Sequence, residues 1–349
     1  MPSFPLTFPS TIGKYITMEV IGQGSFGIVY KAKRREDGLV VVAKTVNYSN
    51  MTNQDRQQVV DEVQILRDLQ HPNIVKYLDR YIDIGRKILW IFMEYCPGGD
   101  LAEFISWHRD ANKRIPENTV WKIAAQLSMA LHECHGEDRA CEAMGSKANV
   151  ILHRDIKPAN VLLDQHCNVK LGDFGLSRTL QAEDFARTYV GTPYYMAPEV
   201  IDRSTYDEKC DMWALGCLLY ELCTLHTPFE ADTREELEGL IRRGQYDPIP
   251  RDHYSGHLSS FISALVQVNV RLLPHLLIWQ GGMNGVNTHS SLFSLSLYSY
   301  SLIADQRLAI ASPTIPFGLF FWIRKQIRGQ SASFIPSIHP LILISFFTP

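Results

Sequence analysis

Alternating apolar and polar residues dominate the first hundred positions of the chain, a pattern with the period of β-strands. Five such runs are separated by turn residues: Tyr15–Val20, Ile28–Lys33, Leu39–Val46, Ile74–Tyr81 and Lys87–Met93. Several prolines precede Thr11, and we interpret residues 1–14 as a disordered leader. The pattern therefore predicts a small lobe built on a five-stranded sheet.

One helix is expected between the third and fourth strands. Thr52 and Asp55 have the spacing of a helix-capping box. The apolar stripe that follows consists of Val59, Val63, Leu66 and Leu69. Glu62 falls on this stripe, where an unpaired carboxylate is costly. A lone strand lysine such as Lys44 is usually solvated. We instead predict that Lys44 forms an ion pair with Glu62.

After residue 100 the apolar spacing becomes helical. The predicted helices are Leu101–Arg109, Glu117–His135, Lys209–Leu225, Arg234–Arg243 and Leu258–Val268. The third is apolar almost all round, which indicates a buried central helix. Pro and Gly within residues 94–99 break the strand pattern as a hinge does. The sequence therefore predicts a bilobal α+β fold, with a sheet lobe over residues 15–93 and a helical lobe over residues 100–269.

The second predicted helix ends in residue types that bind metals: His132, Glu133, Cys134 and His135. A zinc site needs further ligands nearby, and the sequence provides none. We therefore favour a helix-end surface over a zinc site, followed by a polar surface loop over residues 136–149.

Composition narrows the classes of function. The chain has 349 residues and a net charge of −3, which indicates no large basic face for nucleic acid. Its seven cysteines form no C-x-x-C pair, so we expect reduced thiols in a cytoplasmic or nuclear protein. The N-terminus has no basic region followed by an apolar core, and we interpret it as lacking a secretory signal.

The strongest chemical signal is His153–Asn160 followed by Asp173-Phe174-Gly175. Two short strands between them predict a hairpin, and a hairpin brings its ends side by side. Asp155, Asn160 and Asp173 should therefore converge. Phosphoryl transfer from ATP needs such a cluster: a carboxylate near the acceptor hydroxyl, and oxygen ligands for Mg²⁺.

A second motif is Gly22-Gln23-Gly24-Ser25-Phe26-Gly27. G-x-G-x-x-G alone is weak evidence, because dinucleotide-binding folds use it to open a helix. Here a strand pattern follows, which favours a glycine flap between two strands over the turn that opens a helix in dinucleotide-binding folds.

These motifs resemble those of eukaryotic protein kinases. Lys157, and the run Gly191-Thr192-Pro193-Tyr194-Tyr195, are similar to the serine/threonine class. Further runs, among them Phe92–Leu101 and Gly216–Cys223, resemble the NIMA-related mitotic kinases over roughly residues 15–269. The resemblance implies phosphorylation of protein serine and threonine side chains with ATP and Mg²⁺. It also implies roles in mitosis, with microtubule or spindle-pole partners and a location at the spindle pole or centrosome.

The resemblance also implies roles for individual residues. Asp155, Lys157, Lys44, Glu62 and Thr192 would serve catalysis, and Asn160 and Asp173 would ligate the metal. The ATP-binding positions would be Ile21, Gly22, Gly24, Gly27, Val29, Lys44, Met93, Glu94 and Cys96. Phosphorylated Thr188 would pair with Arg154. Structural roles fall on Asp211, which would hold the catalytic loop, and on Glu199 with its partner Arg307.

The kinase pattern fails after residue 269. Residues 270–303 are rich in Leu, Ser and Tyr, and we interpret them as a translated intron. Ala304–Ile310 would then be the displaced last motif of the domain, followed by an aberrant apolar tail over residues 311–349. The alternative is a genuine tail with membrane affinity. Charges and prolines leave no run of the ~20 apolar residues that a spanning helix needs.

Two other functions stay open. A scaffold or pseudokinase usually lacks one of the Lys, Asp or Asn positions, and all are present here. A catalytically impaired product is the second, because the odd C-terminal stretch could disturb the helical lobe.

Overall fold

A computed structural model describes residues 11–24, 27–136, 151–173, 193–204 and 206–269, without the side chains of Gln58, Asp61 and Glu62. Thr188, Thr192, Arg307, the insert and the tail lie outside these residues, so the predictions that concern them stay predictions. Within the described residues no helix is long and apolar enough to cross a membrane.

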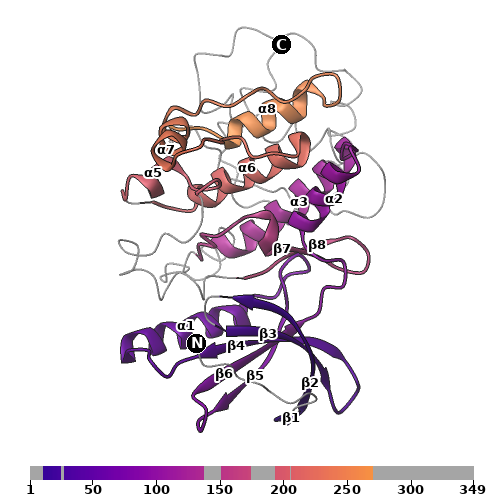
Figure 1. Cartoon of the computed structure of the whole chain (residues 1–349), viewed down its shortest axis with the longest axis vertical. Coiled ribbons are helices and arrows are strands. Elements are labelled where there is room, and N and C mark those ends of the chain that lie inside the picture. Colours follow the sequence, from indigo (N-terminus) through magenta and orange to yellow (C-terminus); the bar gives the residue numbers. More distant parts are fainter. Residues whose placement is uncertain (1–10, 25–26, 137–150, 174–192, 205, 270–349) are drawn as a thin grey trace, which may run out of the picture. The chain divides into compact units, whose positions relative to one another are not determined.

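The N-terminal part of the fold is one antiparallel sheet in the order β1-β2-β3-β4-β6-β5 (Figure 1). Its strands are β1 (Thr11–Ile12), β2 (Tyr15–Gly24), β3 (Gly27–Arg34), β4 (Val40–Asn47), β5 (Tyr77–Asp83) and β6 (Ile88–Glu94). The five expected strands are all present. The sixth, β1, pairs with the start of β2, so the last four residues of the expected leader belong to the fold.

Helix α1 (Asn53–Asp68) follows the predicted capping box: the Thr52 side chain accepts from the Asp55 amide, and the Asp55 carboxylate accepts from the Thr52 amide. Its apolar stripe packs against one face of the sheet. Val59 and Val63 share a buried cluster with Leu89 and Ile91 of β6. Strand alternation directs Trp90 and Phe92 to the opposite face, where they form a second cluster.

The C-terminal part of the fold is mainly helical. Its elements are α2 (Leu101–Asp110), α3 (Glu117–His135), η1 (Pro158–Asn160), β7 (Val161–Leu163), β8 (Val169–Leu171), α5 (Pro198–Ile201), α6 (Lys209–Thr224), α7 (Arg234–Arg243) and α8 (Gly256–Leu265). Every residue of α6 from Cys210 to Cys223 is buried, which confirms the predicted central helix.

Close packing on α6 depends on a glycine. A Cβ atom at Gly216 would lie 2.7 Å from the side chain of Val266 and 2.8 Å from that of Leu265. Any larger residue would therefore force α8 and its C-terminal end away from α6. Gly216 therefore allows the C-terminal end of α8 to pack directly on α6.

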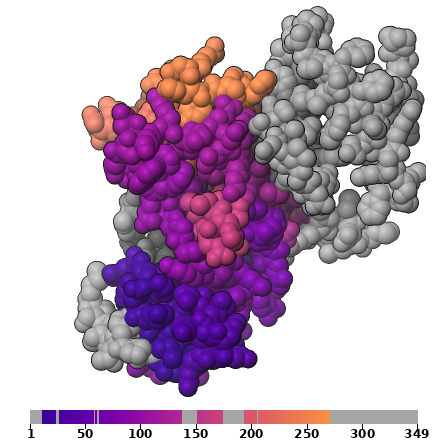
Figure 2. All heavy atoms as spheres, turned by 90° about the vertical axis from the view of Figure 1, so that its right-hand side faces the viewer, coloured from indigo at the N-terminus to yellow at the C-terminus, as the bar shows by residue number. Residues whose placement is uncertain are grey.

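The β7–β8 hairpin joins the two parts of the fold. The amide of Val75, which precedes β5, donates to the carbonyl of Leu171 at 2.9 Å. The amide of Leu171 in turn donates to the carbonyl of Asn73 at 2.8 Å. In Figure 2 the rose-coloured residues of this hairpin reach the surface among violet and magenta ones.

Candidate active site

The β7–β8 hairpin brings the predicted metal-binding residues together. Val161 pairs with Leu171 in the ladder. One step beyond it, the amide of Gly172 donates to the carbonyl of Asn160 at 2.9 Å. Asp173 follows directly, with a backbone φ of +58° that turns the chain out of the strand. Asn160 and Asp173 therefore lie at the same end of the hairpin, as the sequence predicts.

Asp155 lies in the same cluster. Its Oδ2 atom accepts hydrogen bonds from Nζ of Lys157 at 2.9 Å and from Nδ2 of Asn160 at 2.8 Å. The same Asn160 amide lies 2.7 Å from the Asp155 carbonyl oxygen. These contacts fix the Asp155 carboxylate beside a lysine that can neutralise phosphate charge, which is the arrangement a phosphoryl acceptor site requires.

Buried Asp211 holds the loop that carries Asp155. Its Oδ1 accepts from the amide of Arg154 at 2.8 Å, and its Oδ2 accepts from the amide of His153 at 2.9 Å. Nε2 of His135 approaches the same Oδ2 at 3.1 Å. The predicted structural role of Asp211 therefore has its contacts in the structure. His135 and Cys134 are buried, so the prediction that they belong to a helix-end surface was wrong.

Burial acts to raise the pKa of the Asp211 carboxyl, but the hydrogen bond from His135 and the nearby His153 outweigh it, so the pKa lies below its usual range. Burial also lowers the pKa of His153. The neutral ring has one assignment that satisfies both neighbours: Nε2–H donates to the carbonyl of Gly172 at 2.9 Å, and Nδ1 accepts from the amide of Asp155 at 3.3 Å. This ring links the Asp155 loop to the Asp173 end of the hairpin.

Lys44 reaches the cluster from β4. Its Nζ donates to Oδ1 of Asp173, and its side chain is only 14% exposed. This contact places the positively charged side chain of a sheet residue at the candidate metal site. The predicted partner Glu62 lies on α1, but its side chain is outside the described residues, so the Lys44–Glu62 pair stays a prediction.

The glycine motif lies on the turn between two antiparallel strands. Gly24 pairs with Gly27 at the ends of β2 and β3, so no helix follows the motif and the dinucleotide-fold alternative is wrong. A Cβ atom at Gly27 would lie 2.1 Å from the carbonyl oxygen of Thr45. Only glycine permits this close approach of β3 to β4. Ile21 is exposed at 44% and Val29 is half-buried, so both predicted positions can contact a ligand.

The predicted adenine-binding residues lie where β6 ends. Met93 is half-buried, and Glu94 is the last residue of the strand rather than the first of the hinge. The amide of Glu94 already donates to the carbonyl of Lys76 at 2.9 Å. The Cys96 amide binds no other described residue, which leaves it available to a ligand. Burial, with Glu94 nearby, raises the pKa of the Cys96 thiol to about 12, so the thiol stays protonated.

Asn160 and Asp173 suit Mg²⁺, which takes few protein oxygens and completes its shell with phosphate and water. Because Nδ2 of Asn160 is used by Asp155, its Oδ1 remains for a cation. Asp173 keeps its Oδ2 beyond the contact with Lys44. The described residues contain no group of three or more His, Cys, Asp or Glu that could hold a metal alone. The site fits a metal that arrives with a phosphate.

Arg154, the expected partner of phosphorylated Thr188, has a left-handed backbone with φ of +66°. Its guanidinium lies over the ring of Tyr206, 5.6 Å from the centroid. Thr188 and Thr192 are outside the described residues, so their roles stay predictions.

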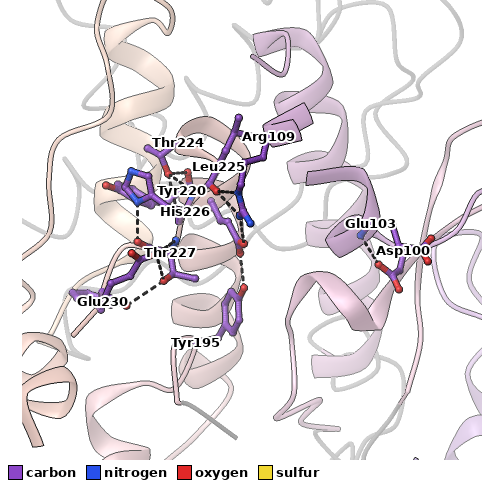
Figure 3. A network of polar contacts seen from close by, with 12 residues as sticks. Asp100, Glu103, Arg109, Tyr195, Tyr220, Thr224, Leu225, His226, Thr227 and Glu230 are labelled. Carbon is purple, nitrogen blue, oxygen red and sulfur yellow. Dashed lines mark hydrogen bonds and ion pairs between the residues drawn. The ribbon is translucent and has the colours of Figure 1, made fainter. Parts of the chain in front are cut away.

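The segment that contains Tyr195 is fixed to the end of α6 (Figure 3). The Tyr195 hydroxyl donates to the Glu221 carboxylate, which also lies 3.9 Å from the guanidinium of Arg109 on α2. Nε of Arg109 donates to the carbonyl of Leu225 at 2.8 Å. Burial and the neighbouring Glu221 raise the pKa of Tyr195, so its hydroxyl stays a donor. Sequence reasoning missed this network because its members are far apart in the chain.

The Glu199 carboxylate has no basic side chain paired with it within the described part of the chain. Its Oε1 is buried and accepts no hydrogen bond there. Burial, and then the carboxylates of Asp207 and Asp202, raise the pKa of Glu199 above its ordinary 4.5. The predicted partner Arg307 is outside the described residues, so the pair remains a prediction.

Changing Glu199 to Gln is expected to raise Tm at pH 7 by about 2–4 °C, because the carboxylate is buried and has no basic partner among the described residues. A raised folded pKa means that wild-type stability falls as pH rises from about 4.5 through that pKa. The stabilisation should therefore disappear at acid pH. Thermal unfolding between pH 4 and 8 checks this.

Glu238→Gln is the matched control. The Glu238 carboxylate pairs with Arg234 and Arg242, and Arg234 chiefly lowers its pKa, so this change should slightly lower Tm at pH 7. A Glu199→Gln variant less stable than the wild-type chain at pH 7 would instead indicate an ionic partner outside the described residues, as the predicted pair with Arg307 requires.

Comparison with known proteins identifies the class. A family profile described as the protein kinase domain matches residues 15–272. The chain therefore belongs to the protein kinase family, and the sheet lobe, hairpin and helical lobe are those of that fold.

Within the family the chain is similar to NIMA-related serine/threonine kinases. It is 45% identical over 263 residues to "Probable serine/threonine-protein kinase nek2" of Dictyostelium discoideum, covering 75% of this chain and 60% of that protein. It is 46% identical over 261 residues to Nek2 of Homo sapiens, covering 74% of this chain and 57% of that protein. It is 43% identical to "G2-specific protein kinase nimA" of Emericella nidulans, covering 73% and 39%. The matches thus span about three fifths or less of these relatives.

Proposed function

We propose that this chain transfers the γ-phosphate of ATP to serine or threonine side chains of proteins. The observation that carries the proposal is the cluster in which Asp155 accepts from Lys157 and Asn160, with Asp173 and Lys44 at the adjoining hairpin end. These groups supply a carboxylate for the acceptor hydroxyl, oxygen ligands for a cation and two positive charges for phosphate.

The chemistry follows from these positions. The glycine turn and Lys44 bind the phosphates of ATP. Asp155 orients the acceptor hydroxyl and takes its proton as the oxygen bonds to the γ-phosphorus and the bond to the β-phosphate oxygen breaks. Lys157 neutralises charge on the transferred group. Asn160 and Asp173 would hold Mg²⁺, which would further neutralise the charge of the phosphates. Positioning and electrostatics account for the rate.

The similarity to NIMA-related kinases supports a finer proposal. We infer a role in cell-cycle control, in the cytoplasm and nucleus, with spindle-pole or microtubule proteins among the substrates. The words "G2-specific" in the names of the relatives from Emericella nidulans and Schizosaccharomyces pombe support this role.

The test is phosphate transfer from radiolabelled Mg-ATP to peptides that differ only in carrying serine, threonine or tyrosine. We expect labelled serine and threonine peptides, unlabelled tyrosine peptide, and no transfer after Mg²⁺ is chelated. Lys44→Met should abolish transfer because it removes the cation that reaches the phosphates.

The impaired-product and scaffold alternatives give different results. A scaffold would show thermal stabilisation by ATP without transfer. An impaired, misassembled product would show neither transfer nor stabilisation by ATP. Either outcome from the wild-type chain would contradict the proposed activity.

A further inference from the structure

The C-terminal end of the hinge is hydrogen-bonded to the β7–β8 hairpin. The amide of Gly98 donates to the carbonyl of Leu163, and the amide of Leu163 donates to the carbonyl of Gly99, both at 2.9 Å. A Cβ atom at Gly98 would lie 2.8 Å from the Cβ of Leu163. Backbone therefore packs directly on backbone there, and this end of the hinge cannot shift without breaking two hydrogen bonds.

The N-terminal end of the hinge is held by the side chain of Glu94, the last residue of β6. Oε1 of Glu94 lies 2.7 Å from Nζ of Lys170 on β8, and Oε2 accepts from the amide of Lys76 at 3.0 Å. The protonated thiol of Cys96 lies 3.9 Å from Oε1. Glu94 thus uses both carboxylate oxygens, and it connects β6, the segment before β5, the hinge and β8.

This ion pair differs from an ordinary surface pair, which contributes little. The side chains of Lys170 and Glu94 are only 15% and 23% exposed, and the pair joins residues 76 positions apart. Lys170 is the middle residue of β8, and Asp173, a candidate metal ligand, follows three residues later at the end of the hairpin. The pair therefore connects the expected adenine-binding segment to the hairpin that holds Asn160 and Asp173.

We propose that the Glu94–Lys170 pair is a positioning device for the nucleotide: it fixes the hinge on β8 and thereby sets nucleotide affinity. The proposal rests on the proposed function, because it takes the hinge as the adenine-binding segment. A ligand that binds a hinge already held in one conformation pays less ordering entropy. Breaking the pair should weaken nucleotide binding more than it slows the chemical step.

The test measures the Kd for ADP and for ATP with Mg²⁺ by calorimetry, and KM and kcat by peptide phosphorylation. The variants are Glu94→Gln, Lys170→Met, their combination, and Lys170→Arg. Each of the first two should raise Kd and the KM for ATP about three- to tenfold while kcat changes less than twofold. The double variant should lose no more than either single variant, because the two residues act as one pair. Lys170→Arg keeps the charge and should stay near wild type.

Lys122→Met is the matched control. This lysine of α3 donates to the carbonyl of Cys167 at 2.9 Å, at the turn of the same hairpin, and it has no hydrogen bond or ion pair with a hinge residue in the described structure. It should leave Kd unchanged. Thermal unfolding of every variant separates a loss of fold from a loss of affinity.

Additive losses, a Kd within twofold of wild type in both single variants, or an equal loss in Lys122→Met would each overturn the proposal. Tight nucleotide binding without phosphate transfer would overturn the proposed activity and leave the pair testable by Kd alone. A wild-type chain that binds no nucleotide would overturn both.

Discussion

Phosphate transfer is expected to fall by at least about a hundredfold when Asp155 is changed to Asn, the range seen when a positioned proton acceptor is lost. The amide has the shape of the carboxylate and can still accept from Lys157 and Asn160 through its oxygen. It cannot take the proton of the acceptor hydroxyl. We therefore expect kcat to fall while the KM for ATP and Tm change little, as measured by initial rates and thermal unfolding.

Asp164→Asn provides the control for this experiment. Asp164 lies in the turn of the same hairpin, where its Oδ1 accepts from the amides of His166 and Asn168 at 2.8 Å. It has no contact with the Asp155 cluster in the described structure. The control should keep wild-type kcat. Retention of more than about a tenth of the activity by Asp155→Asn would remove Asp155 from the proposed mechanism.

Changing Asp211 to Ala should lower the free energy of unfolding by about 3–5 kcal/mol, the usual result of removing one partner from a buried charged contact. The amides of His153 and Arg154 and the ring of His135 would all lose their acceptor. Because the first two belong to the Asp155 loop, activity should disappear at temperatures where the variant is still folded. Urea unfolding and initial rates measure the two effects.

The effect of Asp211 on stability has a defined pH dependence. A folded pKa below the ordinary 3.8 means that its stabilisation is complete above that value and is lost as pH falls through the folded pKa. The difference between wild type and Asp211→Ala should persist from pH 7 to pH 4 and shrink below it. Asp207→Ala, at an exposed residue before α6 whose Oδ1 accepts from the Lys209 amide, should have little effect. Equal losses in both variants would contradict the role of Asp211.

The sequence predicts those parts of the fold that depend on local patterns. The capping box of Thr52 and Asp55, the buried character of α6 and the five longer strands follow from periodicity and turn residues. Strand β1 has only two residues and no period of its own. It forms because Thr11 and Ile12 can pair with Ile16 and Tyr15 across a turn. Composition alone predicts that the same residues belong to a proline-rich leader.

In the site, residues near the hairpin were predictable because a hairpin converts sequence order into proximity. Long-range electrostatic partners were not. From the sequence alone, Lys170 is an ordinary strand lysine and His135 a helix-end residue. Only the structure shows that Lys170 pairs with Glu94 and that His135 contacts Asp211 of α6. Such pairings depend on the packing of whole elements, which single-sequence patterns do not specify.

The glycine contact between α6 and α8 determines the order in which the chain can fold during synthesis. All six strands of the sheet and α1 are complete once Glu94 has left the ribosome, so this part can form early. The central helix α6 ends at Thr224, yet Gly216 gains its covering side chains only when Leu265 and Val266 emerge. During the intervening forty or so residues, about two to eight seconds of translation, one of the most apolar helices of the protein lacks part of its cover. Nascent chains stalled in this interval should therefore be the species that chaperones bind.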